Sequence, residues 1–166
     1  MKTTIIIIVC FMVHLNVISQ AGKEHFILAS QKADAGDYNG AIDGFTKSIA
    51  LEPNLAEAYY NRGLSKSGLK DYTGAIADIK KAMNLKPTLS ATGYSDIGLY
   101  KYYMDDFKGS IADCAKAIEL NPNLAAAYTN RALAKRSLKL EFCSDLKKAR
   151  DMGEKQAIKY YHLDCE

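Results

Sequence analysis

The amino-acid sequence predicts an all-α protein built from repeated pairs of antiparallel helices. Its three prolines, Pro53, Pro87 and Pro122, lie 34 and 35 residues apart, and each follows a segment with helical patterning. Proline cannot continue a helix, so each one marks the end of a copy. Small residues recur in register between the prolines, in the triplets Gly40-Ala41-Ile42, Gly74-Ala75-Ile76 and Gly109-Ser110-Ile111. A period of this length holds one helix pair, so three copies of such a pair are expected.

The copies are expected over residues 22–55, 56–89 and 91–124. In the second copy, helical patterning covers Ala56 to Leu69 and Thr73 to Leu85. A fourth, degenerate copy is expected over residues 125–152, with a second helix that begins two residues early at Phe142 and with Gly153 in place of the proline.

Residues 153–166 predict one further helix. Its residues Ala157, Ile158 and Tyr161 are expected on one side. A repeat array exposes an apolar face at its last copy, and a terminal helix with a polar outer side covers such a face. The segment is therefore interpreted as a capping helix.

The composition is that of an ordinary globular protein. The chain has 166 residues, of which 48% are hydrophobic and 25% charged, and its formal net charge is +3. Basic and acidic residues alternate along the whole length, so no nucleic-acid partner is expected.

Residues 1–21 differ from the rest and predict a secretory signal peptide. An apolar run from Ile5 to Val13 follows Lys2, and Ser19-Gln20-Ala21 supplies small residues at the positions a signal peptidase requires. The run is about half of the ~20 residues that a membrane-spanning helix needs. Export to the periplasm or the medium is expected, and an uncleaved segment that anchors the chain in a membrane is the open alternative.

The repeats resemble the tetratricopeptide repeat (TPR) family. The family pattern of bulky and small residues followed by proline is present in the second copy, and the other two follow it in register. The positions are Tyr59, Gly63, Ala75, Ala82 and Pro87, then Tyr94, Gly98, Ser110, Ala117 and Pro122, and His25, Ala29, Ala41, Ser48 and Pro53. The resemblance implies a TPR solenoid, a right-handed superhelix of antiparallel helix pairs with a C-terminal capping helix.

The resemblance also implies a non-catalytic scaffold that binds a protein or peptide segment in a concave groove. Groove positions are counted from the first residue of each copy, and position six holds Asn61, Asp96 and Asn130. In family members, asparagines at this position form a ladder that hydrogen-bonds the backbone of a bound peptide. Other groove residues expected to contact a peptide are Tyr60, Leu64, Leu99, Tyr103 and Leu133. Two alternatives stay open: the asparagines satisfy local backbone, or the protein is a passive structural component of a cell-envelope assembly.

Some family members clamp the C-terminal carboxylate of heat-shock chaperones with lysine, arginine and asparagine. At the clamp positions this sequence has Phe26, Ser30, Asn61, Thr92 and Asp96, of which only Asn61 matches. The clamp is therefore expected to be absent.

No motif in the sequence predicts catalysis. After the predicted cleavage only two histidines remain, and there is no nucleophile elbow, metalloprotease motif, phosphate loop or dinucleotide turn. The chain is expected not to be an enzyme and to need no cofactor, metal or small-molecule substrate.

The cysteines predict one disulfide. Cys143 begins the last repeat helix and Cys165 ends the capping helix, and both helices run about 15 Å from the turn at Gly153 at ~1.5 Å per residue. An antiparallel pair would bring the two thiols to one level. Free thiols, or a zinc site that includes His162, remain as alternatives, and Cys114 is expected to be a buried, inert thiol.

Charged residues recur at fixed repeat positions. Lys32, Lys66, Lys101 and Lys135 share one position, Arg62 and Arg131 another, and the facing helices carry Asp78, Asp113 and Asp145. These residues predict ion pairs between helices rather than a ligand site.

Overall fold

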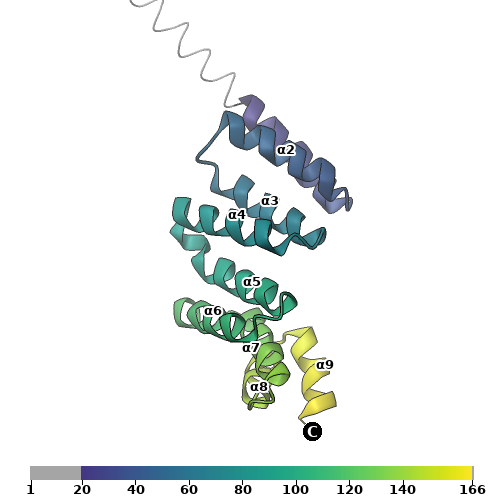
Figure 1. Ribbon diagram of the computed structural model, residues 1–166, viewed down its shortest axis with the longest axis vertical. Helices are drawn as coiled ribbons and strands as arrows, with labels where there is room; N and C mark the ends of the chain where they lie inside the picture. The colour runs from purple at the N-terminus through teal and green to yellow at the C-terminus, as the bar shows by residue number, and fades with distance from the viewer. Residues whose placement is uncertain (1–19, 166) are drawn as a thin grey trace, which may run out of the picture. The chain divides into compact units, whose positions relative to one another are not determined.

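The computed structural model describes residues 20–165, and this part of the chain is all-α, without a strand. The predicted signal peptide lies outside the described residues except for Gln20 and Ala21. The chain divides into two compact units, Met1–Leu85 and Lys86–Glu166 (Figure 1).

The first unit contains two pairs of helices. A helix over residues 20–34 is followed by α2 (Tyr38–Leu51), and α3 (Ala56–Gly68) is followed by α4 (Tyr72–Leu85). Both α2 and α4 begin after an aspartate whose carboxylate accepts a hydrogen bond from a glycine N–H three residues later, at 2.9 Å for Asp37 and Gly40 and 2.9 Å for Asp71 and Gly74.

Small residues allow the helices of the first unit to pack closely. Ala29, Ala41, Phe45 and Ala58 form a core cluster, each with no exposed surface. A Cβ at Gly63 of α3 would lie 3.0 Å from the carbonyl oxygen of Ala75 in α4. The small residues of the repeat pattern therefore lie where two helix backbones approach each other.

The second unit contains two further pairs and a final helix. After a short 3₁₀ turn, η1 (Pro87–Leu89), α5 (Ser90–Tyr103) packs against α6 (Phe107–Leu120). The fourth pair is α7 (Ala125–Ser137) and α8 (Cys143–Asp151). Helix α5 also packs against α7, so the first helices of successive pairs are neighbours within this unit.

The last helix, α9 (Lys155–Asp164), covers the fourth pair. Ala157 joins Ala132, Leu146 and Ala149 in a buried cluster. Ile158, which is expected on the same side as Ala157 and Tyr161, is 37% exposed. Since successive residues of a helix are about 100° apart, Ala157 and Tyr161 share the packed face and Ile158 lies beside it.

Each turn between the two helices of a pair uses the left-handed backbone region at the same repeat position. Gly36 has φ of 80°, and Lys70, Asp105 and Lys139 have φ of 63°, 60° and 56°. The four exposed residues close the same kind of turn, with a glycine only in the first copy.

The predicted ion pairs between helices are confirmed in the second, third and fourth copies. Asp78 of α4 accepts hydrogen bonds from Arg62 at 2.7 and 2.8 Å, and its carboxylate lies 2.8 Å from Lys66 Nζ. The same arrangement joins Asp145 to Arg131 and Lys135, and Asp113 pairs with Lys101 at 2.6 Å. The first copy has Gly44 where the others have aspartate, so the corresponding pair cannot form there.

These contacts shift the pKa values of two carboxyl groups. Burial acts to raise the pKa of Asp78, but the hydrogen bonds from Arg62 and Lys66 outweigh it and hold this pKa below its usual value. Burial also acts to raise the pKa of Asp145, and the hydrogen bonds from Arg131 and Lys135 outweigh it, so this pKa is lowered as well. Both aspartates are therefore charged near neutral pH.

Candidate functional site

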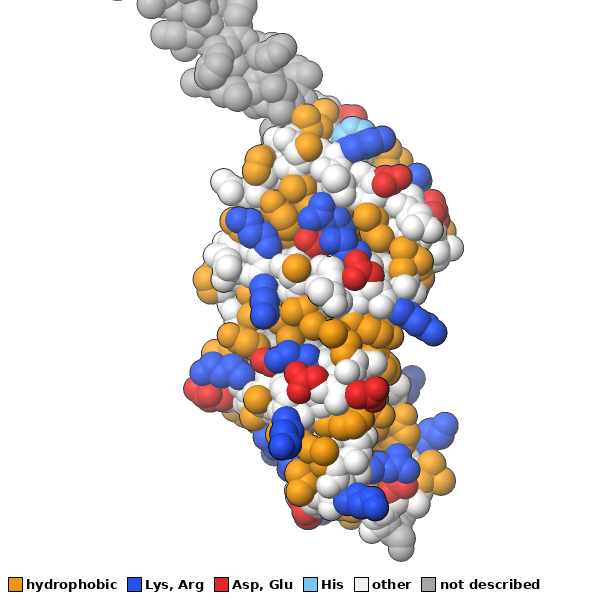
Figure 2. Space-filling model, in the orientation of Figure 1, with side chains coloured by type: hydrophobic (Ala, Val, Ile, Leu, Met, Phe, Trp, Pro, Cys, Tyr) orange, Lys and Arg blue, Asp and Glu red, His pale blue; other side chains and the backbone are white. Residues whose placement is uncertain are grey.

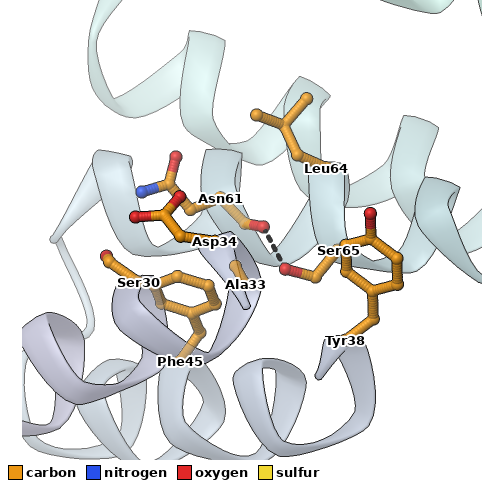
Figure 3. Close-up of a pocket in the computed structure, with 8 residues that line it drawn as sticks. All are labelled: Ser30, Ala33, Asp34, Tyr38, Phe45, Asn61, Leu64 and Ser65. Carbon is orange, nitrogen blue, oxygen red and sulfur yellow. Dashed lines mark hydrogen bonds between the residues drawn. The ribbon is translucent and has the colours of Figure 1, made fainter. Parts of the chain in front are cut away.

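A pocket of about 310 Å³ lies in the first unit, between the helix over residues 20–34 and α3 (Figure 3). The first helix contributes Ser30, Ala33 and Asp34, and α3 contributes Asn61, Leu64 and Ser65. Each set follows the spacing i, i+3, i+4, which places its members on one face of a helix. Tyr38 and Phe45 of α2 complete the lining.

The pocket has two polar groups without a partner at one end. Figure 3 shows the carboxylate of Asp34 and the amide of Asn61 near each other. Within residues 20–165, neither side chain forms a hydrogen bond or an ion pair. The two serine hydroxyls are already used, because Ser30 donates to the Phe26 carbonyl at 3.0 Å and Ser65 to the Asn61 carbonyl at 2.9 Å. A ligand would find three acceptor oxygens, two from Asp34 and one from Asn61, and the NH₂ of Asn61 available.

The rest of the pocket is apolar and firmly packed. Phe45 has no exposed surface, whereas Leu64 is 40% exposed at the rim. The Tyr38 ring lies against Gly68, where an added Cβ would be 2.7 Å from the ring. The glycine thus makes room for the tyrosine that forms one wall.

The predicted groove residues are distributed over both units. Asn61 and Leu64 line the pocket, and Tyr60 is half-buried beside them on α3. Asp96, Leu99 and Tyr103 lie on α5, and Asn130 and Leu133 lie on α7. Their contact with a peptide stays a prediction.

Asn130 has a different environment from Asn61. Its side chain is 8% exposed, and Nδ2 donates to the carbonyl oxygen of Ser95 at 3.2 Å and to its hydroxyl at 3.3 Å. This geometry matches the alternative in which the asparagine satisfies local groups, so we leave Asn130 out of the binding surface proposed below.

Of the eight residues that line the pocket, the sequence predicted only Asn61 and Leu64 as binding residues. Ser30, Ala33 and Asp34 occupy groove positions nine, twelve and thirteen of the first copy. The predicted asparagine ladder follows position six, where the first copy has Ile27, which is 54% exposed. Reading all groove positions in each copy would have indicated them.

In the second unit, Cys143 and Cys165 are joined, with their Cα atoms 5.7 Å apart. Such a separation suits a disulfide, and the pairing stays a prediction for the protein in solution. As predicted, Cys114 is a buried thiol, and burial raises its pKa to about 12.

No group of three or more metal-ligating side chains is found in residues 20–165. None of the described helices has the length and hydrophobicity to cross a membrane. On the face shown in Figure 2, basic and acidic side chains are interspersed over each unit.

The comparisons with known proteins agree with this fold. A sequence model of the tetratricopeptide repeat family matches residues 56–89, the range expected for the second copy. No match is found among curated protein sequences.

Several solved structures are similar to the chain. The crystal structure of MamA has 29% sequence identity and a TM-score of 0.73, with 82% of this chain and 81% of that chain covered. The first TPR of Spaghetti (RPAP3), bound to the HSP90 peptide SRMEEVD, has 23% identity and a TM-score of 0.67, with 73% and 95% covered. The TPR2B domain of yeast Sti1, in a complex with pHsp70, has 19% identity and a TM-score of 0.65, with 71% and 98% covered. The helix pairs, the repeat pattern and these matches confirm the predicted all-α TPR solenoid, and residues 56–89 match the tetratricopeptide repeat family directly.

Proposed function

We propose that this protein is a non-catalytic scaffold that binds a protein or peptide segment, and that the pocket between the helix over residues 20–34 and α3 is part of its binding surface. The observation that carries the proposal is the unpartnered amide of Asn61 beside an apolar floor. An asparagine amide can donate to and accept from one peptide bond, which holds an extended chain with little regard to its sequence.

The similar structures support this proposal. Two of them contain a chaperone peptide or chaperone complex, which shows that this fold accommodates such partners. The present chain lacks the cations of a carboxylate clamp, since Ser30, Thr92 and Asp96 occupy positions where the clamp uses basic or amide side chains. A chaperone C-terminus is therefore not the partner that we propose.

A random dodecapeptide library displayed on phage tests the proposal. Peptides that bind the full chain would be synthesised, and their affinities measured by fluorescence anisotropy. We expect the double variant Asn61→Ala/Leu64→Ser to weaken binding at least tenfold, because it removes the amide and part of the apolar rim.

A matched control is Asn84→Ala/Leu69→Ser. Asn84 is exposed and Leu69 is 44% exposed, close to the 40% of Leu64, and both lie outside the pocket. Equal losses in the two double variants would contradict a role for the pocket. A library that yields no binder would reject peptide binding and favour a passive structural component of the cell envelope.

We also propose that the protein is exported with cleavage after Ala21. The support is the pattern of residues 1–21 and the paired cysteines, which suit an oxidising compartment. Expression in a host with a secretory pathway, followed by mass spectrometry, should give a mature chain that begins at Gly22. A chain of full mass in the membrane fraction would instead indicate an uncleaved anchor.

A further inference from the structure

Among the residues that the structure describes, Asp34 supplies the only charged group that lines the pocket between the helix over residues 20–34 and α3. The nearest cations along these two helices are engaged elsewhere. Arg62 and Lys66 of α3 bind Asp78, and Lys32 lies 3.9 Å from Asp37. The negative charge of Asp34 is therefore uncompensated within the described residues.

The acceptor oxygens of Asp34 and Asn61 lie above an apolar surface. Ala33 and Leu64 provide this surface, and the Tyr38 ring stands beside it, held against Gly68. A pocket with an apolar floor and an acidic end is complementary to a lysine or arginine side chain, in which an apolar stem carries a charged head.

We propose that the pocket selects a partner segment by a lysine or arginine side chain. The stem lies on Ala33 and Leu64, and the cationic head donates hydrogen bonds to the Asp34 carboxylate and the Asn61 amide oxygen. This inference rests on the proposed peptide binding and adds the chemistry of the partner. A carboxylate clamp binds an acidic chain terminus with positively charged side chains. This pocket is negatively charged, so the partner segment that it binds is basic.

Charge reversal at one residue tests this selection. Dodecapeptides that bind the full-length wild-type chain are expected to share a basic residue next to an apolar one. Replacing that basic residue by alanine should weaken binding about fivefold, the effect expected of a partly exposed ion pair. Asp34→Asn should abolish most of the difference between the two peptides, and Asp34→Lys should favour glutamate at the same peptide position.

Asp43→Asn is the matched control. Asp43 is an exposed carboxylate of the same unit, and it lies outside the pocket. The Asp43→Asn substitution removes the same charge as Asp34→Asn. If both variants lost the preference for the basic peptide, the cause would be net charge in general, and the proposal would be overturned. Binding of the basic peptide should also weaken between 50 and 500 mM salt, because screening acts on exposed charges.

The outcomes separate the two levels of the proposal. Peptides that depend on Asn61 and Leu64 but share no basic residue would reject the selection and keep the peptide site. A library without any binder would reject both. Circular dichroism of the Asp34 variants, which lie at an exposed position, establishes that a changed preference does not come from unfolding.

Discussion

Asn61 and Asn130 occupy the same repeat position and have different surroundings. The amide of Asn130 is buried and donates to Ser95, whereas the amide of Asn61 faces a pocket and has no described partner. A buried amide with partners contributes to stability, and an available one contributes to binding. The residue type alone does not distinguish these roles.

Alanine substitutions should separate the two asparagines. Asn130→Ala leaves the buried groups of Ser95 without their donor, so the free energy of unfolding should fall by about 1–3 kcal/mol. Asn61→Ala should change it by less than about 0.5 kcal/mol. Urea denaturation followed by circular dichroism measures both values, and equal losses would contradict the assignment.

The turns within the helix pairs show how one element tolerates different residues. Gly36 adopts a positive φ without steric cost, while Lys70, Asp105 and Lys139 adopt it against the preference of residues with a Cβ. No atom lies within 4 Å of the position of a Cβ at Gly36, so the difference is one of backbone conformation alone.

Glycine at these turns should stabilise the protein. Lys70→Gly, Asp105→Gly and Lys139→Gly each relieve left-handed strain and increase the entropy of the unfolded chain, which leaves a gain of about 0.5 kcal/mol. The reverse change, Gly36→Lys, should cost about 1 kcal/mol. Thermal denaturation of the four variants tests the opposite signs.

Reduction of the disulfide between Cys143 of α8 and Cys165 after α9 should lower the stability of the protein. A bridge between Cys143 and Cys165 contributes about 3 kcal/mol by restricting the unfolded chain, so a reductant should lower the melting temperature. A Cys143→Ser/Cys165→Ser variant should melt at the reduced value with or without the reductant. Iodoacetamide should leave the native mature protein unmodified, because Cys114 is buried and its pKa is raised to about 12.

The sequence predicted the helices better than the site. Prolines, aligned small residues and paired charges lie at fixed positions, so they located α3, α4 and the Asp78 ion pairs. The pocket depends on which groove residues keep a free polar group after packing, and Asn61 differs from Asn130 only in its neighbours. Asp34 was missed because the ladder position in the first copy is Ile27. Such differences arise from contacts between helices, which one sequence does not record.

At the scale of the whole molecule, the buried aspartates predict a loss of stability in acid. The folded pKa values of Asp78 and Asp145 lie below the usual 3.8, so the unfolded chain binds more protons at low pH. Their contribution is complete well above pH 4 and falls as the pH passes below this value towards the folded pKa values. Urea denaturation between pH 7 and pH 2.5 should show the decrease, and Asp78→Asn should have a smaller pH dependence as well as a lower stability at pH 7.

The absence of an aspartate at Gly44 has a consequence for the dynamics of the first unit. The pairs α3 with α4 and α7 with α8 each have an ion-paired aspartate, and the helix over residues 20–34 lacks the equivalent contact with α2. We expect its amide protons to exchange with deuterium faster than those of α3. Since this helix carries Asp34, a bound segment would have to hold it in place, and exchange in residues 20–34 should slow when a peptide binds. Because Gly44 leaves the first helix without this ion pair, amide exchange in residues 20–34 should report directly whether a peptide occupies the pocket.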